Sequence, residues 1–324
     1  MVDLDAPDVR EAIRAATRAI GGKAAHYGVL RQIEGLPVPP AFAVPVHHYF
    51  QFMEQNGFDA QVRALLEDPA FTDDPAVRDA RLDELREAMK DAPLDPDFEA
   101  MLIAKIRAEF PGTRMRFRSS TNAEDLEGFT GAGLYTSKSG DPDDPDDPVD
   151  EAVKKVWASV WSFRAFEERS YRSIDHLAVG MALLVHRSYP DEEANGVALT
   201  QNPFDQSGLE PAFYVNVQAG ETSVVQPPAG VSTDQFLYFF DRADQPVTFL
   251  SHSNQVADGQ TVLTPAQTFE LGQALETLHR FFTPIYAPRA GDNYTWWAMD
   301  VEFKFDDQPT GTPQLYLKQA RPYR

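Results

Sequence analysis

The spacing of apolar residues predicts that the first third of the chain is mostly helical. Apolar side chains recur every three or four residues over 7–34, for example at Val9, Ile13 and Ile20. This period indicates a helix, which Gly21-Gly22 interrupts. The proline-rich stretch that follows predicts an extended connector into a short strand, because proline is excluded from helix interiors. Further helices are predicted over 47–56 and 59–110.

The period changes to strict alternation at Arg114-Met-Arg-Phe-Arg, which predicts a strand with Met115 and Phe117 on one face. A Ser/Thr/Gly-rich loop follows, then an acidic loop over 140–150 that we expect to be solvated and mobile. Helices are predicted over 151–171 and 265–281, and strands over 179–187, 195–200, 212–218, 235–240, 296–306 and 314–321. The helix-rich first half and strand-rich second half indicate two lobes with a cleft between them.

Composition narrows the classes of function. The chain has 324 residues, a formal net charge of −21 and no cysteine. Its length suggests two folding units, and the lack of cysteine excludes a disulfide framework, a thiolate zinc site and a cysteine nucleophile. The strong acidity disfavours nucleic acids and anionic membranes as partners. Without a membrane-length apolar run or a signal-peptide pattern, the sequence predicts a cytoplasmic protein.

Common catalytic signatures are missing from the sequence. It contains no GxxxxGK[ST] phosphate loop, HExxH, GxSxG or HRD motif. Gly21-Gly22-Lys23 is the first candidate, because two glycines allow a tight turn and the amides of a helix N-terminus together with one lysine can hold a phosphate. Taken alone, the same residues also fit a simple helix break with a solvated lysine.

Three arginines share one face of the predicted strand. Arg114, Arg116 and Arg118 form a local positive stripe in an acidic chain, and arginine grips phosphate through two hydrogen bonds. The alternative is a structural network with nearby acids, which we expect for one or two of the three. In the loop beyond, Thr121 and Glu124 form a possible capping box.

The end of the chain supplies a third candidate. Asp300, Glu302 and Lys304 share one face of a predicted strand, and the return strand carries Gln319 and Arg321. A hairpin can bring a carboxylate, an amide oxygen and a guanidinium together, which suits Mg²⁺ bridging nucleotide phosphates. An ordinary charged hairpin is the alternative.

These segments, in this order, resemble the nucleotide-binding domain of phosphoenolpyruvate synthase and pyruvate phosphate dikinase. Rifampin phosphotransferase and glucan water dikinase carry similar domains. The matching segments are Ile20-Gly-Gly-Lys-Ala-Ala, Pro37-Val-Pro-Pro-Ala-Phe-Ala-Val, Phe117-Arg-Ser-Ser-Thr-Asn-Ala-Glu-Asp-Leu, Gly131-Ala-Gly-Leu-Tyr, Asn195-Gly-Val-Ala-Leu-Thr-Gln-Asn-Pro and Leu315-Tyr-Leu-Lys-Gln-Ala-Arg-Pro.

The resemblance implies an α+β fold, the bilobed ATP-grasp fold, with ATP and Mg²⁺ in a cleft between two subdomains. The N-terminal subdomain is expected at 1–190 and the C-terminal subdomain at 191–324. Lys23, Arg118 and Arg321 would contact the ATP phosphates and serve catalysis.

The resemblance also assigns the remaining site residues. Glu302 and Gln319 would bind the metal, and Thr136 would reach a phosphate. The segment Met181–His186 would line the adenine pocket, although this chain reads Val185-His186-Arg187-Ser188 where the family often has glutamine.

The resulting hypothesis is an ATP- and Mg²⁺-dependent phosphotransferase. It would transfer a phosphoryl or diphosphoryl group to a histidine on a partner domain or to a small molecule. In the family enzymes the acceptor histidine lies on a separate domain, and this chain has no histidine in the family's Thr-x-His-Ala setting. A catalytically silent ATP-binding regulatory or interaction module is the alternative.

Overall fold

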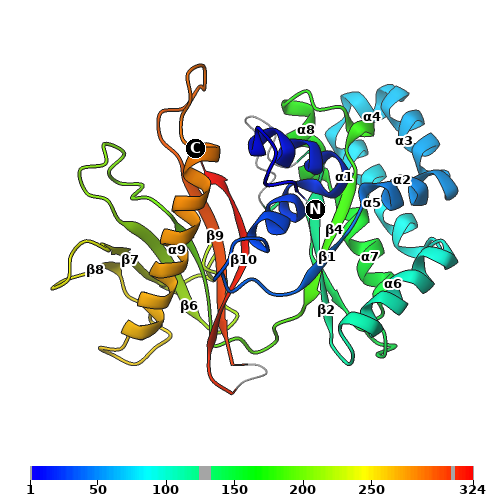
Figure 1. Cartoon of the computed structure of the whole chain (residues 1–324). Helices are drawn as coiled ribbons and strands as arrows, with labels where there is room; N and C mark the ends of the chain where they lie inside the picture. The colour runs from blue at the N-terminus through cyan, green and yellow to red at the C-terminus, as the bar shows by residue number, and fades with distance from the viewer. Residues whose placement is uncertain (1, 124–132, 308–310, 324) are drawn as a thin grey trace. The chain divides into compact units, whose positions relative to one another are not determined.

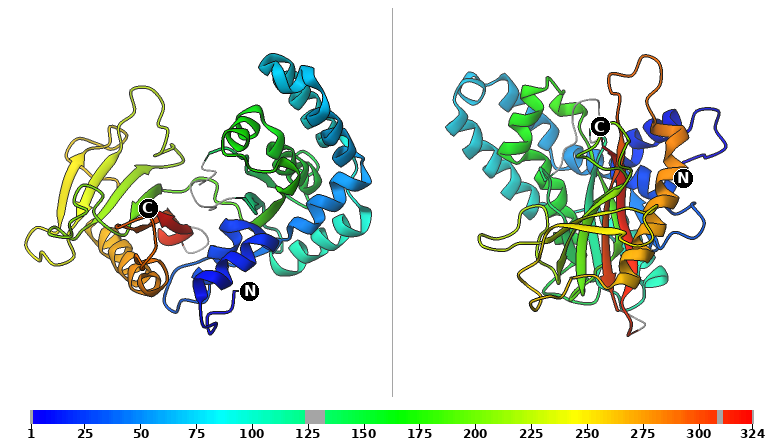
Figure 2. Two further views of the ribbon diagram at one scale, coloured as in Figure 1. Left: turned by 90° about the horizontal axis from the view of Figure 1, so that it is seen from above. Right: turned by 90° about the vertical axis from the view of Figure 1, so that its left-hand side faces the viewer.

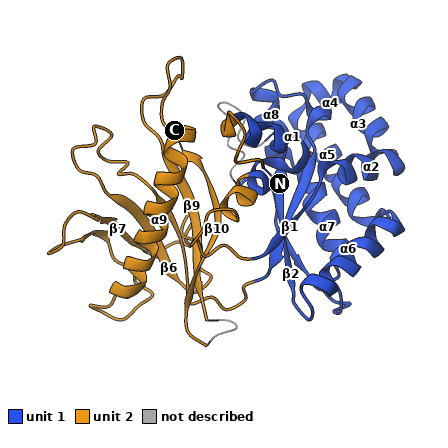
Figure 3. Cartoon of the chain, viewed as in Figure 1, with its two compact units in different colours: residues 1–2, 11–25, 40–188 blue, residues 3–10, 26–39, 189–324 orange. Residues whose placement is uncertain are grey.

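The computed structural model describes residues 2–123, 133–307 and 311–323, and the chain divides into two compact units (Figure 3). The first unit is built mainly from Glu11–Ala25 and Pro40–Ser188, and the second from Asp3–Arg10, His26–Pro39 and Tyr189–Arg324. Helix α1 (Val9–Leu30) therefore contributes residues to both. The subdomains expected at 1–190 and 191–324 stay a prediction.

The first unit contains a four-stranded antiparallel sheet in the order β1-β4-β2-β3. Its strands are β1 (Ala41–Val44), β2 (Met115–Thr121), β3 (Lys138–Gly140) and β4 (Met181–Arg187). Its further helices are α2 (Val46–Gln55), α3 (Phe58–Glu67), α4 (Pro69–Asp73), α5 (Pro75–Asp91), α6 (Pro96–Glu109), α7 (Val149–Ala158) and α8 (Phe163–Tyr171) (Figure 1).

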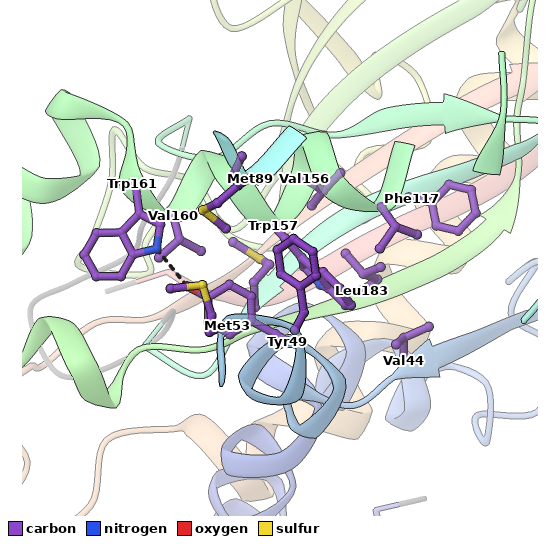
Figure 4. Packing of buried hydrophobic residues seen from close by; sticks show 14 of the residues in the cluster. Val44, Tyr49, Met53, Met89, Phe117, Val156, Trp157, Val160, Trp161 and Leu183 are labelled. Atoms are coloured by element: carbon purple, nitrogen blue, oxygen red, sulfur yellow. Dashed lines mark hydrogen bonds between the residues drawn. The ribbon is translucent and has the colours of Figure 1, made fainter. Parts of the chain in front are cut away.

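The core of the first unit lies between its sheet and its helices. Figure 4 shows aromatic and aliphatic side chains packed around Trp157, which is fully buried. Trp161 donates a hydrogen bond from Nε1 to the Tyr49 hydroxyl at 3.0 Å, so the polar atoms of two large aromatic side chains satisfy each other inside the core.

The second unit contains a six-stranded antiparallel sheet in the order β10-β9-β5-β6-β7-β8. Helix α9 (Pro265–Tyr286) lies along one side of this sheet (Figure 2). The strands are β5 (Ala194–Leu199), β6 (Phe213–Ala219), β7 (Asp234–Tyr238), β8 (Val247–Ser251), β9 (Ala298–Asp306) and β10 (Gln314–Tyr323).

Most predicted elements are confirmed, including the α+β class, but one prediction about the chain after residue 150 is wrong. The helix predicted over 151–171 is interrupted: a 3₁₀ turn over Ser159–Trp161 follows α7, and Ser162 has an extended backbone. Ser162 then caps α8 by accepting a hydrogen bond from the Ala165 amide at 3.3 Å.

Residues 143–146 of the acidic loop are exposed, as expected for a solvated loop, and its mobility stays a prediction. Asp143 forms an ion pair with Arg107, and Asp147 forms ion pairs with Arg114 and Lys138. Basic side chains from α6, β3 and the residue preceding β2 therefore pair with two carboxylates of this loop.

Candidate functional site

The Gly-Gly-Lys turn is a break in α1 where the chain passes directly against β2. Gly21 has φ 76° and ψ 165°, a backbone region that essentially only glycine occupies. A Cβ atom at this position would lie 2.0 Å from the main-chain oxygen of Ser120 and 2.4 Å from its Oγ. Glycine is therefore required here both by backbone conformation and by space.

Ser120 connects this turn to the strand that carries Arg118. Its hydroxyl donates to the Ile20 carbonyl at 2.8 Å and accepts from the Ala24 amide at 3.0 Å. The two bonds bracket Gly21-Gly22-Lys23, so two of the motifs predicted to bind phosphate are joined within the first unit. Lys23 and Arg118 are both half-buried.

The three arginines of the predicted stripe have different surroundings. Arg114, which precedes β2, donates from Nε to Asp147 Oδ2 at 2.7 Å, and Arg116 donates from Nη1 to the Ser139 hydroxyl at 3.3 Å. Arg118 lies opposite Leu184 of β4. The structural-network interpretation therefore holds for Arg114, as expected for at least one of the three.

The roles of three other predicted residues, Thr136, Glu124 and His186, remain predictions. Thr136 is exposed in the loop between β2 and β3, and the Glu124 of the proposed capping box lies outside the described residues. His186 is fully buried on β4, where it lies opposite Ala41 and Arg116, and its Nδ1 lies 2.6 Å from the Arg187 carbonyl oxygen.

The hairpin of β9 and β10 places the predicted metal pair at directly opposed positions. Gln319 pairs with Glu302, and Arg321 pairs with Asp300. A register shift between Leu317 and Gln319 makes this possible. Without that bulge, alternation would place Gln319 on the same face as Leu317, the buried one.

Arg321 and Lys304 of this hairpin pair with carboxylates. Arg321 donates from Nε and Nη2 to Asp300 Oδ2 at 3.0 and 2.9 Å. Lys304 forms an ion pair with Glu192, whose carboxylate is buried. Because Asp300, Glu302 and Lys304 alternate with buried apolar residues, they share one face of the sheet.

The donor set suits magnesium bound partly through a substrate. Within residues 2–123, 133–307 and 311–323, no group of three or more His, Asp or Glu side chains could hold a metal ion. Glu302 and Gln319 offer one carboxylate and one amide oxygen, and Mg²⁺ is commonly held by one or two protein oxygens together with phosphates and water. The pair therefore fits a metal that nucleotide phosphates help to bind.

Comparison with known proteins places the chain in a family. Residues 17–324 match the model of the pyruvate phosphate dikinase AMP/ATP-binding domain. The chain belongs to this family. The ATP-grasp expectation rested on the same resemblance, and the helices and antiparallel sheets of both units agree with it.

Curated relatives are similar over only part of their length. The chain is 29% identical to phosphoenolpyruvate synthase of Aeropyrum pernix over 57% of this chain and 23% of the relative. It is 31% identical to the probable phosphoenolpyruvate synthase of Staphylothermus marinus, over 69% and 27%. It is 28% identical to rifampicin phosphotransferase of a Streptomyces species, over 60% and 22%. The chain thus spans about a quarter of each relative.

Sequence reasoning missed two contacts at the predicted site, that of Ser120 with the Gly-Gly-Lys turn and that of Asp300 with Arg321. Ser120 contacts residues about 100 positions earlier, and nothing local distinguishes it from Ser119. The Asp300–Arg321 pair had a signal, since both residues belonged to the predicted hairpin.

Across the described part of the chain, each helix is too short or too polar to cross a membrane.

Proposed function

We propose that this chain binds ATP together with Mg²⁺ and transfers a phosphoryl or diphosphoryl group from it. The observation that carries the proposal is the register of the β9–β10 hairpin, which sets Gln319 opposite Glu302 and Arg321 opposite Asp300, in a chain that belongs to a family of AMP/ATP-binding domains. An ordinary charged hairpin would not need a bulge that turns an amide side chain from the buried face to the polar one.

Catalysis would rest on positioning and on charge neutralisation. Phosphoryl transfer requires little covalent participation by the protein, because the transition state spreads its charge over the phosphate oxygens. Lys23, Arg118 and Arg321 would bind those oxygens. Glu302 and Gln319 would hold Mg²⁺, which neutralises phosphate charge when bound.

The acceptor would be a histidine on a partner domain or a small molecule. Relatives named phosphoenolpyruvate synthase and rifampicin phosphotransferase differ in the acceptor that their names indicate, yet the chain matches about a quarter of each. A segment shared between such proteins is better suited to the common donor, ATP, than to their different acceptors. The acceptor function would then lie outside the shared segment.

The alternative is a nucleotide-binding module without turnover. The same chain contains both the proposed metal pair and the proposed phosphate-binding cations. A module that only sensed nucleotide would not need both sets. This combination favours the enzyme.

Calorimetry and product analysis test the proposal. Purified protein is titrated with Mg·ATP, then incubated with Mg·ATP and candidate acceptors while ATP, ADP and AMP are resolved. Turnover should require Mg²⁺ and an acceptor, and Lys23→Ala or Glu302→Ala should lower it by on the order of 10²–10³-fold. Wild-type rates in either variant would contradict the assigned site, and binding without turnover with any acceptor would favour the module.

Two arginines provide a matched comparison. Arg118→Ala should weaken ATP binding. Arg114 precedes β2, pairs with Asp147 and is not among the proposed phosphate ligands, so Arg114→Ala should leave ATP binding unchanged. If both substitutions weakened ATP binding equally, the effect would come from the general positive charge of the two arginines. That result would contradict a specific role for Arg118.

A further inference from the structure

The hydroxyl of Ser120 occupies the place of a helix cap. Residues 22–30 are helical, and Gly21, directly before them, is not. A capping side chain normally belongs to the residue before the helix and accepts a hydrogen bond from the amide of the second or third helical residue. Ala24 is the third, and its amide donates to Ser120 Oγ at 3.0 Å.

Gly21 has no side chain with which to supply this cap. The space that its own Cβ would take is filled by Ser120, whose Oγ would lie 2.4 Å from that atom. The hydroxyl also donates to the Ile20 carbonyl at 2.8 Å. One group on β2 therefore fixes the last residue before the Gly-Gly-Lys turn and the first residue after it.

We infer that Ser120 is a positioning residue for Lys23. It holds the backbone of the turn in one conformation before nucleotide binds, so the backbone that carries the lysine does not have to be ordered at the moment of binding. This inference rests on the proposed function, because it assumes that Lys23 contacts the phosphates of ATP.

Ser120 and Arg118 lie on the same strand. Ser120 lies two residues after Arg118 on β2 and is fully buried. The same strand therefore carries one proposed phosphate ligand and fixes the backbone of another. A rigid strand is a more exact support for such a pair than a loop.

The test compares nucleotides with and without phosphates. Ser120→Ala removes both hydrogen bonds and should weaken binding of Mg·ATP about tenfold, as expected for loss of a cap that keeps the binding conformation populated. Affinity for adenosine, which has no phosphate for Lys23 to contact, should not change. Equal losses for ATP and adenosine would mean a general structural role and would overturn the inference.

A matched control isolates the loss of a buried hydroxyl. Ser159 is also buried in the first unit and donates to the Val156 carbonyl at 2.6 Å. Ser159→Ala should leave the ATP affinity unchanged. A similar loss of ATP affinity in both variants would also overturn the inference.

A double-mutant cycle shows whether Ser120 acts through Lys23. In a Lys23→Ala background, Ser120→Ala should weaken ATP binding by much less than tenfold, because the positioned group is gone. A full tenfold effect in both backgrounds would contradict the inference.

Hydrogen exchange of the wild-type protein keeps the inference testable if Ser120→Ala does not fold. The Ala24 amide should be protected in the protein without nucleotide. Rapid exchange that slows only when Mg·ATP is added would show that the turn is not held in advance. Absence of ATP binding by the wild-type protein is a distinct result, which would refute the proposed function together with this inference.

Discussion

Gly21→Ala should destabilise the first unit strongly. The backbone angles of Gly21 lie in a region where other residues cost about 1–3 kcal/mol. The new Cβ would also lie 2.0 Å from the carbonyl oxygen and 2.3 Å from the carbonyl carbon of Ser120. Because these are main-chain atoms, a rotamer change cannot relieve the overlap, and forcing the strand aside should cost roughly another 1–3 kcal/mol.

The expected loss is therefore roughly 2–6 kcal/mol, a large part of the 5–15 kcal/mol typical of a domain. Gly28 offers a matched control, because it lies in the same helix and a Cβ there would meet no atom within 4 Å. Gly28→Ala should stabilise the protein by about 0.5–1 kcal/mol. Urea unfolding of both variants measures the difference. If Gly21→Ala were as stable as the wild type, the conformation and packing described for the turn would be wrong.

Three further predictions concern other parts of the molecule. Thr264→Ala, which removes the capping box of α9, should lower the free energy of unfolding by about 1 kcal/mol in urea titrations; no change would mean that the cap is dispensable. Asp300→Ala should weaken ATP binding about tenfold in calorimetry, because Arg321 loses a charged partner at 2.9 Å; an unchanged affinity would mean that Arg321 needs no positioning by Asp300. Burial, followed by the charge of Arg169, lowers the pKa of His176 to about 4. Its neutral form therefore stabilises the fold fully above pH 6.5, and that contribution falls as the pH drops from 6.5 towards 4. His176→Gln should make stability less dependent on pH in this window, and an unchanged pH profile would contradict this assignment.

Helices and strands could be predicted wherever the spacing of apolar residues matched the local secondary structure. The alternation at 114–118 located β2, and the spacing in 7–34 located α1 together with its break. The same rule failed after α7, because Val160 and Trp161 of the 3₁₀ turn are buried and continue the helical spacing past the point where the helix ends. Strand β8 was missed because it is a short edge strand in which no position is fully buried and two of the five are exposed.

The candidate site was predictable in composition and only partly in geometry. A period of two correctly placed Asp300, Glu302 and Lys304 on one face. The same period, applied to the return strand, would place Gln319 with Leu317 on the buried face, and only the bulge between them sets Gln319 opposite Glu302. The contact of Ser120 with Ile20 depends on tertiary structure that no local pattern encodes.

The acidic loop explains how a chain of net charge −21 can present cations to an anion. Partial burial acts to raise the pKa of Asp147, but the hydrogen bonds and charges of Arg114 and Lys138 together outweigh it and lower this pKa. A carboxylate that is already paired repels an approaching phosphate less than an isolated one, because the field of a close ion pair decays faster with distance than that of a single charge. Asp147 of the loop thus neutralises Arg114, which precedes β2, and Lys138 of β3. Net charge alone therefore argues against polyanionic partners that would cover a wide surface, and not against a small anion bound at one place with its metal ion.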